Sequence, residues 1–352
     1  MDKKPPKIWL LASPHTGDNT QLIALADNLG WSYDIKKLSY RASHAFSRFL
    51  PNSLRGLTDE ARAQLTPPYP DLILGAGQPT EPIALWIKQN ARHKIRLVYV
   101  GTPWVKLDNF DLVITTPQYQ LPKRENVLHI NLPLHKVVPE KLRTARAYWE
   151  PKLKQLPRPW TAVLVGGASG PYTFDEAAAE RLAQQAQSGN GSLLITTSAR
   201  TPELTATALK NSLTVPHYFH AWNGTSSENP FFGILALADQ FIVTADSISM
   251  LSEACATGKP VTMFDTEQGH FVMRDDNVKI GWLGRTLSTT VFRIAMRIAP
   301  KRWSRDLRIV HKQLLASGQA YWLGDAPPTQ TSKSATSALE LATSRVKALL
   351  EI

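Results

Sequence analysis

Short runs of almost continuously apolar residues recur along this chain, and helical patterns stand between them. In the first part of the chain these runs are residues 7–13, 71–77, 95–101, 110–116 and 126–132. The segment GDNTQLIALADNLGW, which follows the first run, spaces its apolar residues along one helix face. Strands that are apolar throughout are typical of parallel sheets that helices cover on both faces. The alternation therefore predicts a doubly wound α/β domain.

The alternation of apolar runs and helical patterns begins again in the second half of the chain. Residues 150–160 are basic and rich in proline, which is typical of a linker. Strand and helix patterns then alternate over 161–174, 192–203, 215–222, 229–238 and 239–265. A chain of 352 residues suits two domains of ordinary size. We predict an N-terminal domain over residues 1–155, a C-terminal domain over 156–325, and an amphipathic C-terminal helix within 326–352.

Charge and composition limit the kinds of partner. The net charge of +11 favours polyanions, which include nucleic acid, anionic lipid and phosphorylated substrates, but the sequence carries no nucleic-acid-binding motif. The apolar runs are far shorter than the ~20 residues of a membrane span. The single cysteine, Cys255, excludes an internal disulfide and a thiolate metal cluster. The first apolar run predicts a strand and not a signal peptide, so we expect a cytoplasmic protein.

The segment 239–265 places hydroxyl and carboxyl groups at the start of one predicted helix. An apolar strand leads to Asp246 and Ser247, either of which can cap a helix that begins near Ile248. In an open parallel sheet, ligands bind where a strand's carboxyl end meets a helix N-terminus, and the free N–H groups there hold phosphate. Glu253 suits a ribose diol, because a carboxylate accepts two hydrogen bonds well. The alternative is that the hydroxyl groups only cap and line a turn.

A glycine-rich turn, GGASG at 166–170, follows the first strand of the second domain. Small residues let backbone amides approach a pyrophosphate closely, although a tight strand-to-helix turn needs them too. Neither this turn nor GAGQPT at 75–80 fits the G-x-G-x-x-G pattern. A nicotinamide or flavin cofactor is therefore not expected.

The turn GGASG, the segment TTSARTPE and the run from Trp222 to Val261 together resemble the family named after the plant mitochondrial-fission protein of elongated mitochondria. Bacterial members of that family are described as glycosyltransferases, and the family looks like the metal-independent GT-B enzymes. The resemblance spans most of the chain and is densest from about residue 160 to residue 261. It implies two Rossmann-like domains that face a cleft, a nucleotide sugar bound by the C-terminal domain, and a last helix that crosses back to the N-terminal domain.

The resemblance also implies a donor site in the C-terminal domain. It places Glu253 at the ribose, Asn229 near the base, and the glycine turn with the serines near the diphosphate. Arg200 would offset the phosphate charge, or else it is a solvated surface arginine. The implied donor-site residues are Gly166, Gly167, Ser169, Gly170, Thr197, Ser198, Arg200, Asn229, Ser247, Ser249, Ser252 and Glu253.

The loop SPHTGDNTQ at 13–21 is the candidate for catalysis in the N-terminal domain. In lipid-sugar glycosyltransferases of the similar fold, the equivalent loop carries catalytic or acceptor-binding groups. Histidine is the usual general base near neutral pH, so His15 is our candidate general base, with Asp18 as its rival. The alternative is that Asp18 caps a helix and His15 is an ordinary loop residue. The loop GTPW at 101–104 is expected to face the cleft without a chemical role.

Two stretches, 40–57 and 290–312, mix arginines with aromatic and aliphatic residues. Basic amphipathic helices of this kind lie on anionic membrane surfaces, or they bury one face in the core and leave a basic face in water. No D-x-D sequence occurs, and His217 and His220 lack acidic or cysteine partners nearby, so no metal site is expected.

These observations predict a metal-independent transferase that uses a nucleoside-diphosphate sugar and no further cofactor. Its acceptor is expected to be a lipid-linked or lipopolysaccharide-type sugar of the cell envelope. Peripheral contact with the cytoplasmic face of the inner membrane fits such an acceptor. The alternative function is a non-catalytic, membrane-associated adaptor on the same fold.

Overall fold

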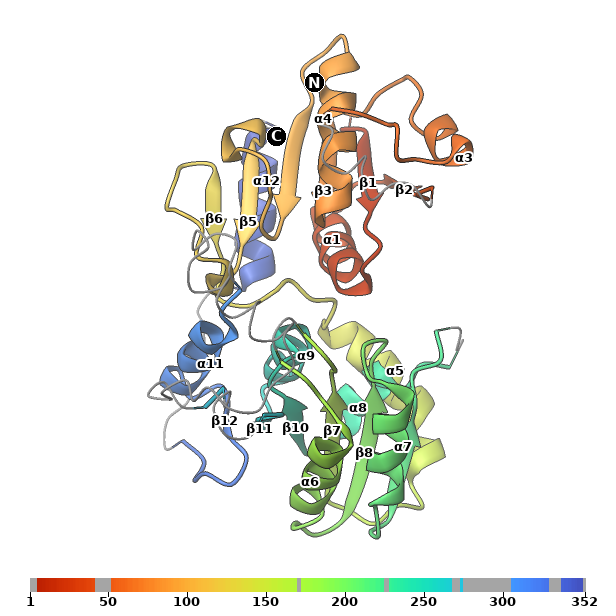
Figure 1. The fold of residues 1–352 in the computed structure, drawn as a ribbon, viewed down its shortest axis with the longest axis vertical. Coiled ribbons are helices and arrows are strands. Elements are labelled where there is room, and N and C mark those ends of the chain that lie inside the picture. The colour runs from red at the N-terminus through yellow and green to blue at the C-terminus, as the bar shows by residue number, and fades with distance from the viewer. Residues whose placement is uncertain are drawn as a thin grey trace, which may run out of the picture. The chain divides into compact units, whose positions relative to one another are not determined.

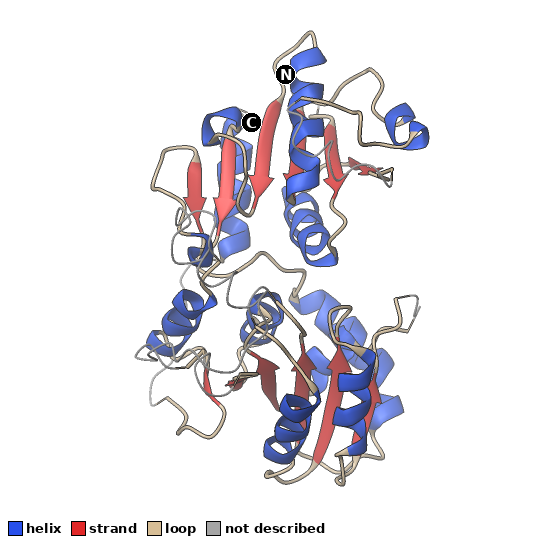
Figure 2. Ribbon diagram, in the orientation of Figure 1, coloured by secondary structure: helices blue, strands red, loops and turns tan. Residues whose placement is uncertain are grey.

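The computed structural model describes residues 5–41, 52–169, 172–224, 228–267, 273–274, 305–328 and 337–350. These residues form two compact units, each built on a six-stranded parallel sheet (Figures 1 and 2). Unit 1 comprises residues 1–136 and 334–352, and unit 2 comprises residues 137–333. The α/β fold class with two doubly wound domains is confirmed. Residues 42–51 and 275–304, which hold most of the two basic stretches, lie outside the described residues.

Unit 1 has its switch of strand order between β1 and β3. Its strands are β1 (Ile8–Ala12), β2 (Tyr33–Lys37), β3 (Leu72–Ala76), β4 (Arg96–Val100), β5 (Leu112–Thr115) and β6 (Val127–His129). They lie in the order β2-β1-β3-β4-β5-β6. The helices described in this unit are α1 (Thr16–Leu29), α3 (Asp59–Ala63), α4 (Glu81–Asn90) and α12 (Ala338–Leu349), with 3-10 turns η1 (Gln78–Thr80), η2 (Leu107–Asn109) and η3 (Pro117–Tyr119).

Both faces of the unit 1 sheet are buried along β1, β3, β4 and β5, which is why these strands are largely apolar, whereas the edge strand β2 is polar and partly exposed. Leu10 and Leu74 pack on the side of α1 and α12, whereas Trp9 and Ile73 pack on the side of α4. The C-terminal helix α12 therefore belongs to the N-terminal unit, as expected, and Figure 1 shows it in blue beside the red and orange elements. A capping box at Ser337 fixes the start of this helix.

Unit 2 has its switch of strand order between β7 and β10. Its strands are β7 (Trp160–Val165), β8 (Ser192–Thr197), β9 (His217–His220), β10 (Gln240–Thr244), β11 (Val261–Phe264) and β12 (Tyr321–Trp322). They lie in the order β12-β11-β10-β7-β8-β9, with parallel pairing throughout the described ladder. The helices described in this unit are α5 (Pro139–Leu153), α6 (Glu176–Ala186), α7 (Glu203–Asn211), α8 (Phe231–Leu237), α9 (Ile248–Cys255) and α11 (Leu307–Ala316).

The units divide at Lys136, earlier than the boundary at residue 155 that the proline-rich stretch indicated. The reason is that α5 packs on α8 inside unit 2. At their contact, a Cβ added to Gly233 would lie 2.3 Å from Cδ1 of the buried Trp149. The proline-rich residues 157–159 therefore connect α5 to β7 within one unit.

Within the described ranges, each helix is too short or too polar to span a lipid bilayer.

Candidate functional site

The candidate site of unit 2 lies at the carboxyl ends of β7, β8 and β10. Because the strand order switches between β7 and β10, the loops that follow these two strands diverge, and open α/β sheets bind ligands at such a point. Gly166 follows β7, Ser198 follows β8 and Ala245 follows β10. The fold therefore brings together three of the segments that the sequence indicated.

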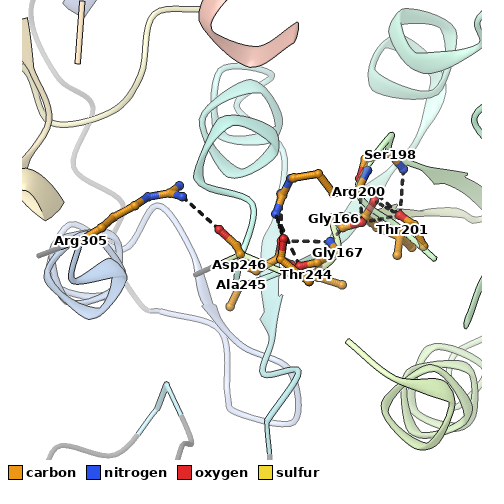
Figure 3. Close-up of polar contacts among 12 residues, drawn as sticks. Gly166, Gly167, Ser198, Arg200, Thr201, Thr244, Ala245, Asp246 and Arg305 are labelled. Carbon is orange, nitrogen blue, oxygen red and sulfur yellow. Dashed lines mark hydrogen bonds and ion pairs between the residues drawn. The ribbon is translucent and has the colours of Figure 1, made fainter. Parts of the chain in front are cut away.

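Asp246 is the polar centre of this cluster, and its side chain is fully buried. Its Oδ2 accepts a hydrogen bond from the Gly167 N–H at 3.0 Å and pairs with Nη2 of Arg200 at 2.9 Å (Figure 3). Its Oδ1 has no hydrogen-bond partner among the described residues. Burial raises the pKa of Asp246, while the Arg200 guanidinium and the Gly167 N–H oppose that rise. This carboxylate joins the loops after β7, β8 and β10.

The two glycines after β7 are required by the close approach of these loops. A Cβ added to Gly166 would lie 2.3 Å from Oδ2 of Asp246, and one added to Gly167 would lie 2.1 Å from the backbone oxygen of Arg200. The Gly166 N–H donates to Oγ1 of Thr244 at 2.8 Å, and the Gly167 N–H donates to Asp246. Both amides are thus bonded inside the protein, whereas the sequence left open both a close approach to a pyrophosphate and a tight strand-to-helix turn.

Replacing Gly167 by Ala is expected to destabilise unit 2. The added methyl group meets backbone atoms, which move less easily than a side chain, so we expect a loss of about 1–3 kcal/mol in the free energy of unfolding. Urea unfolding followed by circular dichroism measures it. A matched control is Gly189→Ala, because a Cβ there meets no atom within 4 Å. Equal stability of the two variants would contradict the packing described for the glycine turn.

The loop after β8 donates side-chain hydrogen bonds to backbone oxygens of the glycine turn. Ser198 Oγ donates to the backbone oxygen of Gly166 at 2.7 Å, and Thr201 Oγ1 donates to the same oxygen. Arg200 Nη1 donates to the backbone oxygen of Ala168 at 3.0 Å. Arg200 is therefore bonded within the protein, a role that neither of the two alternatives drawn from the sequence included. Thr201 was missed, because nothing in TTSARTPE distinguishes it from its neighbouring hydroxyl residues.

Helix α9 begins at Ile248, as predicted, but without the predicted side-chain cap. Ser247 occupies the N-cap position, and neither its side chain nor that of Asp246 caps the helix. The N–H groups of a helix's first turn have no intrahelical acceptor, and the helix dipole makes that end positive. Ser247 and Ser252 are buried and Ser249 is partly buried. The start of α9 therefore offers backbone donors for an anion beside hydroxyl groups.

Glu253 lies one turn and a half further along α9 and is 8% exposed. Burial raises its pKa to about 8, although Lys141 on α5 acts in the opposite direction. Its carboxyl group makes no hydrogen bond in the part of the chain that the structure describes. A buried polar group without a partner is costly, so a ligand that donates to this carboxyl group would relieve the cost.

Two residues of the site come from the region before and within α11 and were not predicted as site residues. His311 places Nε2 2.8 Å from the backbone oxygen of Ala245, and burial lowers its pKa to about 4, so the imidazole is neutral. Arg305 donates from Nη1 to Oγ of Ser169 at 3.0 Å. In the sequence, Arg305 was only one arginine of the basic stretch 290–312, because its contact with the glycine turn depends on tertiary packing.

The remaining predicted donor residues are placed as follows. Thr197 Oγ1 accepts from the Trp222 N–H at 2.9 Å, which ties the end of β8 to the segment after β9. Asn229 is exposed, and its Oδ1 accepts from the Phe231 N–H at the start of α8. Gly170 lies outside the described residues. The structure thus explains local roles for Thr197 and Asn229, and their contact with a nucleotide stays a prediction.

In unit 1, His15 and the first turn of α1, which holds Asp18, lie at the switch point between β1 and β3. Ser13 Oγ donates to Oδ2 of Asp18 at 2.8 Å, and a Cβ on Gly77, just after β3, would lie 2.8 Å from that oxygen. His15 is exposed, and its backbone N–H donates to Ser13 Oγ at 3.1 Å. The N-cap residue of α1 is His15, whose side chain makes no capping hydrogen bond, and Asp18 lies in the first turn of this helix. The catalytic roles of His15 and Asp18 stay predictions.

Glu81 of unit 1 was not singled out in the sequence, although it is only 1% exposed. Its carboxylate accepts from the Tyr99 hydroxyl at 2.9 Å and from the N–H groups of Trp104 and Val105 at 3.0 and 3.1 Å. This residue therefore holds the loop that contains GTPW. Among the described residues, no three His, Cys, Asp or Glu side chains are grouped so as to hold a metal ion.

Comparison with known sequences identifies relatives over most of the chain. A family model described as Mitochondrial fission ELM1 matches residues 16–276. The mitochondrial fission protein ELM1 of Arabidopsis thaliana is 29% identical over 237 residues, which are 60% of this chain and 55% of that protein. The uncharacterized protein RP120 of Rickettsia prowazekii (strain Madrid E) is 28% identical over 306 residues, which are 73% of this chain and 82% of that protein. The chain thus spans little more than half of the Arabidopsis relative.

Comparison with solved structures supports the fold. The UDP-GlcNAc 2-epimerase of Neisseria meningitidis, solved with bound UDP-GlcNAc, matches with a TM-score of 0.50 at 13% identity, over 98% of this chain and all of that chain. MurG of Acinetobacter baumannii matches with a TM-score of 0.44 at 12% identity, over 98% of this chain and 90% of that chain. At 13% identity the likeness to the epimerase concerns the α/β architecture alone.

Proposed function

The chain belongs to the Mitochondrial fission ELM1 family, and from this premise we propose that it is a glycosyltransferase. It moves a sugar from a nucleoside-diphosphate sugar to a lipid-linked or lipopolysaccharide-type acceptor at the cytoplasmic face of a membrane. One observation carries the proposal: the uncapped start of α9 and the buried carboxyl group of Glu253 lie on one helix at the switch point of unit 2.

The two ends of α9 suit the two polar parts of a nucleoside diphosphate. The first-turn N–H groups and the Ser249 hydroxyl suit the diphosphate, because a helix N-terminus favours anions. Glu253, five residues beyond Ile248, lies about 7 Å further along the helix axis, and its carboxyl group suits the two hydroxyls of a ribose. The likeness in fold to an epimerase solved with UDP-GlcNAc supports a nucleotide sugar as the donor.

In the proposed reaction, the bond between the sugar's anomeric carbon and the diphosphate oxygen breaks, and a bond to the acceptor oxygen forms. The start of α9 stabilises the negative charge that develops on the leaving diphosphate. The acceptor hydroxyl gives its proton to a base in unit 1, for which His15 is the candidate and Asp18 the rival. Because the sequence contains no D-x-D, we propose that no metal ion is needed.

A thermal-shift screen tests the proposal. We expect the chain to be stabilised by at least one nucleoside diphosphate or its sugar, since a ligand that binds only the native state at 100 times its Kd adds about 2.7 kcal/mol of stability. The panel contains UDP, dTDP, GDP, ADP and CDP with their common sugars, each measured with and without EDTA. If none of them raises the melting temperature, the donor site is refuted, and a shift that EDTA abolishes contradicts the metal-independent mechanism.

The second candidate function is a non-catalytic, membrane-associated adaptor. It is favoured by the name of the Arabidopsis relative, which refers to mitochondrial fission and not to sugar transfer. An adaptor needs no nucleotide, so the same screen separates the two functions. Absence of any shift, together with binding of the chain to anionic vesicles, would favour the adaptor.

A further inference from the structure

Arginines contact the glycine turn of unit 2 from two segments that are far apart in the sequence. Arg200 belongs to the loop after β8, and Arg305 immediately precedes the N-cap residue of α11. In Figure 3 their side chains reach the cluster from opposite sides of the view. The two guanidinium groups differ in whether a carboxylate of the described residues compensates their positive charge.

The charge of Arg200 is compensated inside the protein. Its Nη2 lies 2.9 Å from Oδ2 of the buried Asp246, and its Nη1 donates to the backbone oxygen of Ala168. Asp246 cannot return to water while unit 2 is folded, because it is fully buried. Transfer of Arg200 to a phosphate would therefore leave a buried carboxylate without its cation, which is strongly unfavourable.

The charge of Arg305 has no such compensation among the described residues. Nη1 of Arg305 donates to Oγ of Ser169, which is a neutral acceptor, and its Nε is buried without a hydrogen-bond partner in the described chain. The adjacent carboxylate, Asp306, is occupied by Arg308, whose Nε and Nη2 each lie 2.9 Å from one of its oxygens. A partly buried guanidinium without an anion is a costly arrangement.

We propose that Arg305 is the side-chain cation that binds the diphosphate of the nucleotide sugar, and that Arg200 is not; this inference rests on the proposed function. A guanidinium presents five donors in a planar fork, which matches the oxygens of a phosphate. Ser169, which belongs to the glycine turn, accepts a hydrogen bond from this guanidinium and so keeps it beside the turn. Because its oxygen accepts from Arg305, its hydroxyl proton remains to be donated to the same anion. Arg200 acts as a positioning residue that holds the turn through Asp246.

The test compares Arg305→Gln with Arg308→Gln in the full chain. Both variants remove one arginine charge from the same segment, but of the two only Arg308 pairs with a carboxylate of the described residues. Calorimetry measures the Kd of the nucleoside diphosphate that binds wild type best, of its parent nucleoside, and of inorganic pyrophosphate. A lost charge-assisted hydrogen bond corresponds to a roughly 10- to 150-fold weaker Kd. We expect that loss in Arg305→Gln for the diphosphate and for pyrophosphate, a smaller loss in Arg305→Lys, and less than a twofold change in Arg308→Gln.

The outcomes separate this inference from the proposed function. If wild type binds a diphosphate and Arg305→Gln binds it equally well, the role of Arg305 is refuted while the donor site stands. An equal loss in Arg308→Gln also refutes it, because then any nearby positive charge suffices. A loss for the parent nucleoside as large as for the diphosphate refutes it too, because it shows a change of fold and not a lost phosphate contact. If wild type binds neither a nucleoside diphosphate nor pyrophosphate, both proposals fall together.

Discussion

Replacing Arg200 by Gln is expected to destabilise unit 2 by about 3 kcal/mol at pH 7, which is the lower end for breaking a buried ion pair. We take the lower end because the Arg200 side chain is 41% exposed, although that of Asp246 is fully buried. The neutral amide of the variant cannot supply a charge, so Asp246 would remain ionised in an apolar environment or take up a proton. Urea unfolding of the full chain, followed by circular dichroism, measures the loss.

The pH dependence and a double-mutant cycle show whether the loss comes from this ion pair. Burial already raises the pKa of Asp246, and loss of Arg200 removes the largest opposing influence. A carboxyl group with a raised folded-state pKa destabilises the fold increasingly as pH rises above its unfolded value of about 3.9. The deficit of Arg200→Gln should therefore be largest at neutral pH and shrink toward pH 4. Asp246→Asn should recover part of it in the double variant, and strict additivity would contradict the coupling.

The strands and the first residue of α9 could be predicted because their signals are local. Apolar runs predicted β7, β8 and β10, and the strand that leads to Asp246 and Ser247 predicted a helix that begins near Ile248. The side-chain cap of α9 was predicted wrongly for a tertiary reason. Asp246, which local rules assign to the helix start, instead pairs with Arg200 on another loop. That partner lies far earlier in the chain, and a capping rule does not include it.

The sheet order places the segments proposed as a donor site at one edge of the unit 2 sheet, and their contact with a nucleotide stays a prediction. For the amides of Gly166 and Gly167 the sequence left two interpretations open, close approach to a pyrophosphate or a tight strand-to-helix turn, and the structure bonds these amides to Thr244 and Asp246. Arg305 was one arginine of a basic stretch for which a membrane surface and a solvated helix face were both open, because composition alone describes a basic stretch and not its neighbours. In both cases the missing information is which loops the sheet order places together.

Replacing Glu253 by Gln is expected to make the chain more stable and a weaker binder of nucleotide. The pKa of Glu253 is raised from 4.5 to about 8 by burial. The folded state therefore binds a proton that the unfolded state releases, and wild type loses stability as pH rises from 4.5 to 8. This penalty amounts to roughly 3 kcal/mol at pH 7, and it is absent from the variant, whose amide does not titrate. The stability gain should vanish below about pH 4 and reach its full size above about pH 8.

The same variant should bind its nucleoside diphosphate about 10- to 100-fold more weakly, because the carboxylate, which two donated hydrogen bonds favour over the acid, offers one oxygen to each ribose hydroxyl, whereas an amide has a single acceptor oxygen. Calorimetry with the ribose and 2′-deoxyribose forms of one diphosphate checks this role, since only the ribose form offers the full diol. Glu180→Gln, on the exposed side of α6, is the matched control and should change neither stability nor affinity. Increased stability with unchanged affinity would show that Glu253 is a buried acid with no part in the donor site. Decreased stability would contradict the burial from which its raised pKa arises.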